Sequence, residues 1–278
     1  MFLLKQILPA AIVAMMVATG ISLFALWCRE RARRVLIPLA IGLGYLSGHL
    51  FITGRFGFPP ADTTNWLPCF ALAAAALGAF FASLRLPAWA RLFLFAMLAA
   101  GALRLLLKPK FQYGWSLGQG WAWVVSLALG IVLLAIVLDA LARRPETAMA
   151  LPFYLLLVSA ATFGALMLSG SMLLGQFATV LAAAVFGTIV LTLRGISVGP
   201  ALAPLFSLLL GALLISGYFF AELPAMSAAL LAFAPAVALF SFLPPETVRA
   251  FLFRTALMSL PIIAALALAF RASPPLDY

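Results

Sequence analysis

The sequence predicts an all-α integral membrane protein, a polytopic bundle of about ten transmembrane helices forming one domain over residues 1–278. Hydrophobic residues make up 66% of the chain and charged residues only 9%, with a mean hydropathy of +1.20. A surface in contact with water would need far more polar side chains, so this composition excludes a soluble globular protein. The charges also collect in short gaps between apolar stretches of about 20 residues, the length that a helix needs to cross a bilayer.

Ten apolar stretches account for nearly all of the chain. We assign each one to a helix because of its apolar length, since a helix satisfies its backbone hydrogen bonds internally and can therefore cross hydrocarbon. In chain order the expected helices cover residues 7–27, 35–53, 66–84, 88–107, 117–141, 148–168, 172–193, 198–220, 224–243 and 248–270.

The first stretch, 7–27, has the appearance of a secretory signal because Lys5 precedes an apolar segment. The arginine-rich run 29–34 follows it directly and is typical of a stop-transfer flank. We therefore expect this stretch to be a helix that the protein retains.

The gaps between the later stretches differ in length. The longest gap, 54–65, is rich in aromatic residues and prolines, which predicts an ordered loop at the membrane interface. Only residues 169–171 separate the stretch 148–168 from the stretch 172–193, so we expect a tight helical hairpin there.

Lysines and arginines are unevenly divided between the two sides of the predicted bundle. One side receives only Lys5, Arg55, Arg104, Lys108, Lys110 and Arg271, and the other receives all the rest. Cytoplasmic loops are enriched in Lys and Arg, so we expect the richer side to be cytoplasmic and both termini to lie outside. The net charge of +10 then reflects topology and attraction to anionic membrane lipids, with no soluble domain to bind nucleic acid. The short loops favour a bacterial cytoplasmic (inner) membrane.

A candidate internal repeat relates residues 36–108 to residues 203–271. The segment 47–51 is similar to 216–220, and the segment 91–95 is similar to 249–253. An offset of six crossings gives both copies the same orientation, which predicts a parallel repeat about an axis along the membrane normal. The alternative is chance similarity, because apolar helices draw on few residue types.

His49 is the only histidine of the chain and lies four residues after Tyr45. The neighbouring Gly44 and Gly48 have the spacing that lets another helix approach closely. Polar side chains within membrane spans are rare and often functional, so His49 is a candidate substrate-binding residue that titrates near neutral pH. The alternative role is a hydrogen bond to a neighbouring helix.

Four cations gather on the side where positive charge is disfavoured: Arg55, Arg104, Lys108 and Lys110. Arg104 and Lys108 stand four residues apart and share a helix face. With Trp115 nearby, the group is a candidate outer-face site for a phosphate, a carboxylate or a lipid headgroup. The alternative is a set of snorkelling anchors within an interfacial belt of aromatic residues.

The sequence contains no motif of a hydrolase, a metalloenzyme or a nucleotide-binding protein, so we expect neither enzymatic activity nor a cofactor. We favour a permease-like protein that moves or binds an amphipathic or anionic substrate, or a lipid headgroup, near its outer face. The alternative is a non-catalytic scaffold or anchor subunit, because alanine-rich runs such as 71–76 could pack against partner membrane proteins. A weaker alternative is an intramembrane lipid-modifying enzyme that uses His49.

Overall fold

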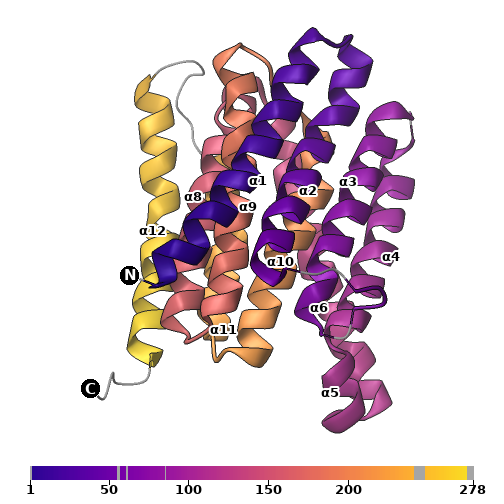
Figure 1. The fold of residues 1–278 in the computed structure, drawn as a ribbon, viewed down its shortest axis with the longest axis vertical. Coiled ribbons are helices and arrows are strands. Elements are labelled where there is room, and N and C mark those ends of the chain that lie inside the picture. The colour runs from indigo at the N-terminus through magenta and orange to yellow at the C-terminus, as the bar shows by residue number, and fades with distance from the viewer. Residues whose placement is uncertain (1, 55–56, 61, 85, 241–247, 274–278) are drawn as a thin grey trace.

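The computed structural model describes residues 2–54, 57–60, 62–84, 86–240 and 248–273, and within these ranges the chain is helical without any strand. Nine of the described helices are long and apolar enough to cross a membrane. They lie side by side along the long axis of the molecule (Figure 1). The predicted class, an all-helical bundle of membrane-spanning length, is therefore confirmed.

The helices follow the expected order closely. Their bounds are α1 (Phe2–Trp27), α2 (Glu30–Thr53), η1 (Thr64–Trp66), α3 (Leu67–Ser83), α4 (Ala88–Leu106), α5 (Lys108–Tyr113), α6 (Leu117–Arg143), α7 (Pro145–Ala148), α8 (Leu151–Leu168), α9 (Met172–Leu193), η2 (Pro200–Leu202), α10 (Ala203–Phe220), α11 (Ala225–Val237), η3 (Ala238–Phe240) and α12 (Val248–Ala272). The short helices α5 and α7 lie in gaps where no helix was expected.

The expected ninth span, 224–243, is the exception, and its last three residues lie outside the described residues. Its helix, α11, has only 13 residues and gives way to the 3-10 turn η3 at Ala238. Pro235 lies inside α11 two residues before its end, and a proline in a helix removes one backbone hydrogen bond and crowds the preceding turn. At 1.5 Å per residue α11 is about 20 Å long, which is shorter than the hydrocarbon core.

The two ends of the bundle differ in composition. We call one the arginine-rich end, because it holds residues 29–34, the α6–α7 junction and the segment 194–199, and the other the aromatic end, because it holds α5 and the start of α6. Arg144 donates a hydrogen bond to the carbonyl of Leu239 in η3 (2.9 Å), so α11 and η3 still lead the chain to the arginine-rich end. Figure 1 marks both chain ends in the half of the molecule that holds α5.

The core of the bundle is centred on α10 and α9. In the most apolar part of each helix, 89% of α10 and 72% of α9 is buried, against 22% of α1 and of α12. The exposed side chains of α1 and α12 are almost entirely apolar, as expected for a surface that faces lipid. The predicted parallel repeat stays a prediction.

Glycines allow α1 and α9 to approach α2 closely, as the spacing of Gly44 and Gly48 predicts. A Cβ atom on Gly48 would lie 2.6 Å from a methyl group of Val180 in α9 and 3.0 Å from the carbonyl oxygen of Ala10 in α1. A Cβ on Gly44 would lie 2.9 Å from the carbonyl oxygen of Ala14. Neither position has room for a side chain, so the predicted close approach is confirmed.

The predicted tight hairpin between α8 and α9 is also confirmed. Gly170 adopts a left-handed φ of +82°, and the Ser171 amide donates to the Leu166 carbonyl (3.1 Å). The Ser171 hydroxyl in turn accepts a hydrogen bond from the Leu174 amide (3.4 Å), which caps the start of α9.

Candidate functional site

The structure places the predicted outer-face residues in two separate environments. Arg104, Lys110 and Trp115 lie together at the aromatic end, Lys108 is exposed on α5, and His49 packs inside the bundle. Arg55 lies outside the described residues.

Aromatic rings surround the cations of the aromatic end. The guanidinium carbon of Arg104 lies 4.0 Å from the ring centre of Phe111, and the Lys110 ammonium lies 6.0 Å from that of Phe219. Trp115 contacts both of these rings, at centroid distances of 6.0 Å to Phe111 and 5.2 Å to Phe219. The three predicted residues are thus linked through shared aromatic neighbours, which is the geometry of cation–π contacts in an interfacial belt.

His49 is 1% exposed and lies flat against Phe177 of α9, with ring centroids 4.2 Å apart and planes 16° from parallel. The side chain of Asn65, in η1, lies near the imidazole. Within the described part of the chain, Nδ1 of His49 and the hydroxyl of the buried Tyr45 have no hydrogen-bond partner. The alternative role of this residue, a hydrogen bond to a neighbouring helix, stays a prediction, and the contact that the structure shows with α9 is the ring stacking on Phe177.

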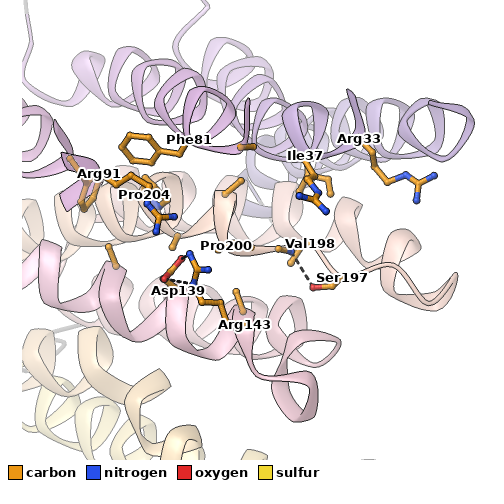
Figure 2. A pocket seen from close by; sticks show the side chains of 18 of the residues that line it. Arg33, Ile37, Phe81, Arg91, Asp139, Arg143, Ser197, Val198, Pro200 and Pro204 are labelled. Atoms are coloured by element: carbon orange, nitrogen blue, oxygen red, sulfur yellow. Dashed lines mark hydrogen bonds and ion pairs between the residues drawn. The ribbon is translucent and has the colours of Figure 1, made fainter. Parts of the chain in front are cut away.

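A cavity of about 1140 Å³ opens at the arginine-rich end, opposite the predicted outer-face site. It lies between the starts of α2, α4 and α10 and the ends of α3 and α6, and residues 195–199 close one side. Figure 2 shows Arg91 of α4 and the pair Asp139 and Arg143 of α6 within it, with Phe81 and Pro204 near Arg91. The described lining includes four arginines and two carboxylates, hence a net formal charge of +2.

Ion pairs within single helices neutralise two of these arginines. Arg143 donates two hydrogen bonds to Asp139, from Nε (2.7 Å) and from Nη2 (3.1 Å), which is the local pair that their four-residue spacing predicts. Arg34 pairs with Glu30 in the same i, i+4 arrangement. Both carboxylates of the cavity are therefore engaged by arginines of their own helices.

The remaining two arginines differ in their surroundings. Arg33 donates hydrogen bonds to the carbonyls of Ala25 (3.1 Å), Leu26 (3.3 Å) and Cys28 (3.3 Å), so it satisfies the last turn of α1. The side chain of Arg91 forms no ion pair or hydrogen bond with any described residue, and its Nε atom is buried. The cavity thus contains one guanidinium whose donors the described protein leaves unused.

Sequence reasoning missed Arg91 as a site residue because it used this residue only for the charge of one side and for the candidate repeat. Its position held a usable signal: Arg91 falls inside the apolar stretch 88–107, where a charged side chain is costly and often functional. The same holds for Arg254, which lies inside α12, is 4% exposed and packs beside Tyr154 of α8.

No protein-family model matches the chain, and no curated protein or solved structure matches it either.

Proposed function

We propose that this chain is a permease-like membrane protein that binds an anionic or amphipathic ligand in the cavity at its arginine-rich end. One observation carries the proposal: the cavity is lined with a net charge of +2, and the side chain of Arg91 within it has no hydrogen-bond or ion-pair partner among the described residues. A concave, partly apolar space with a few convergent polar groups is the usual form of a small-ligand site. This location replaces the outer face as the preferred site.

The cellular setting belongs to the same proposal. Because Lys and Arg are enriched at the arginine-rich end, this end faces the cytoplasm, and the membrane is the inner membrane of a bacterium. The basic and aromatic side chains of the aromatic end then act as anchors at the outer membrane–water interface, in contact with membrane lipids. His49 acts in packing, since its ring is buried and stacks on Phe177 of α9.

Ligand-dependent stabilisation tests the proposal. The purified protein in mild detergent is heated with a panel of anionic, zwitterionic and cationic compounds, some soluble and some amphipathic. A ligand present at 100 times its dissociation constant stabilises the folded state by about 2.7 kcal/mol. We expect anions alone to raise the unfolding midpoint by several degrees. No shift with any anion would contradict the proposal.

A second measurement separates a carrier from a scaffold subunit. An anion that stabilises the protein is followed across the membrane of proteoliposomes, and we expect faster movement than in protein-free vesicles. Binding without movement, together with a stoichiometric protein partner in native mass spectrometry of the extracted protein, would favour the scaffold alternative.

A further inference from the structure

The cavity at the arginine-rich end is lined in part by apolar side chains that are also exposed on the bundle. Ile136 of α6 and Leu92 of α4 both line it. Each is also exposed, Ile136 to 43% and Leu92 to 38%. The chain therefore places apolar side chains at the rim between α4 and α6.

The exposure of Ile136 belongs to the outer surface of the bundle. Val125, Leu129 and Leu133 precede it on the same face of α6, and all three are exposed without lining the cavity. Residues spaced by three or four positions share one face of a helix. Ile136 thus continues the lipid-facing stripe of α6 to the point where that stripe meets the cavity.

The charged groups lie beside this rim. Arg91 immediately precedes Leu92 in α4, while Arg143 follows Ile136 by seven residues, or about 10 Å along the axis of α6. A ligand held by Arg91 would therefore have its charged group inside the cavity and a short apolar path past Leu92 and Ile136 to the acyl chains of the bilayer. A small hydrophilic anion would leave that apolar path unused.

We infer that the cavity takes an anionic amphiphile from within the bilayer, with its phosphate or carboxylate headgroup on Arg91 and its hydrocarbon chain leaving between α4 and α6. This inference rests on the proposed function and adds the class of ligand and its route. An arginine is suited to this role because its planar guanidinium donates two parallel hydrogen bonds to such a headgroup. The engaged carboxylates Glu30 and Asp139 leave the positive charge of Arg91 uncompensated by any described acid.

The test compares three probes on the full-length protein in detergent: dioleoyl phosphatidic acid, inorganic phosphate and dioleoyl phosphatidylcholine. Titrations followed by native mass spectrometry give the affinities for the lipids, and competition gives the affinity for inorganic phosphate. We expect phosphatidic acid to bind and the other two probes to bind at least about tenfold more weakly, because only phosphatidic acid combines an anionic headgroup with acyl chains.

Two pairs of variants, together with Arg91→Lys, locate the binding site. Arg91→Gln should lower the affinity for phosphatidic acid by about tenfold or more. Arg91→Lys should lower this affinity less, because lysine keeps the charge but cannot form the bidentate contact. Arg31→Gln, at an exposed arginine of the same end that does not line the cavity, should bind as the wild type does. Ile136→Trp should obstruct the path of the acyl chain, so it should weaken the binding of phosphatidic acid and leave that of inorganic phosphate unchanged. Leu133→Trp, one turn away and outside the lining, should weaken neither.

Different results would overturn different claims. Unchanged binding in both Arg91→Gln and Ile136→Trp would remove the inference and leave the proposed function standing. Equal affinity for inorganic phosphate and phosphatidic acid would show that free phosphate is the source and would also overturn it. If the wild type binds no anion of either kind, the proposed function fails as well. Gel filtration and circular dichroism verify the folding of each variant, and the Ile136→Trp and Leu133→Trp pair decides the matter if Arg91→Gln does not fold.

Discussion

At the scale of single residues, the flat contact between His49 and Phe177 predicts what substitution of the histidine will do. His49→Ala removes a fully enclosed ring and leaves a cavity beside Phe177, which costs about 2 kcal/mol or more. His49→Phe keeps the stacked ring and loses only the polar contact with Asn65. We expect the thermal unfolding midpoint in detergent to fall by about 4 °C or more for His49→Ala and to change little for His49→Phe.

The same two variants distinguish a packing role of His49 from a role in a lipid-modifying enzyme. A lipid-modifying activity that used the imidazole would be lost in both variants, whatever their stability. Equal loss of stability in His49→Ala and His49→Phe would contradict the packing role, because it would show that the polar atoms of His49 contribute more than its ring does.

Individual residues were also where the sequence was least informative. The Asp139 and Arg143 pair could be predicted because both partners lie on one helix, four residues apart. Arg91 could not be recognised as unpaired, since the residues that surround it come from α3, α4, α6 and α10, and their meeting depends on the packing of the whole bundle. Side chains that are far apart in the sequence carry no periodic signal of their proximity.

At the scale of the helices, the close approach of α1 and α9 to α2 predicts a stability cost for any side chain at Gly48. Helix association within lipid depends on van der Waals packing between small residues, because the lipid tails are as apolar as the helices are. Gly48→Ala puts a methyl group 2.6 Å from Val180 and 3.0 Å from the Ala10 carbonyl oxygen, so α1 or α9 must shift. Such overpacking costs about 1–3 kcal/mol, and we expect the unfolding midpoint in detergent to fall by several degrees.

Gly130 provides the matched control for this measurement. It also lies within a helix, α6, but a Cβ atom there would meet nothing within 4 Å. Gly130→Ala should therefore leave the midpoint unchanged or raise it slightly, because alanine favours the helix more than glycine does. If Gly48→Ala proved as stable as Gly130→Ala, the close packing of these three helices would be contradicted.

The helices themselves were predictable because apolar length is a property of contiguous sequence. Nine expected spans correspond to helices long enough to cross a membrane. The length of the helix in the stretch 224–243 was overestimated because the stretch is apolar throughout. The α-helix ends at Val237, two residues after Pro235, and a 3-10 turn follows. Hydropathy alone does not register that change in backbone geometry.

At the scale of the whole molecule, α11 decides on which side the chain ends. Although α11 is short, it and η3 carry the chain between the two ends of the bundle, so the described helices make an even number of passes. An even number places the N-terminal and C-terminal helices with their free ends on the same side. The bias of Lys and Arg then predicts that the arginine-rich end is cytoplasmic and that the aromatic end is external.

Labelling of single cysteines tests this orientation. In a background of Cys28→Ser and Cys69→Ser, Ala32→Cys introduces a thiol at the arginine-rich end and Gln112→Cys introduces one on α5, both at exposed positions. We expect a membrane-impermeant maleimide to label Gln112→Cys in intact bacterial cells and to label Ala32→Cys only after the inner membrane is opened. The reverse pattern would place the arginine-rich cavity outside, and labelling of both thiols in intact cells would contradict a bundle that spans the membrane between them. Neither substitution removes a charge, so the bias of Lys and Arg that the prediction depends on is unchanged.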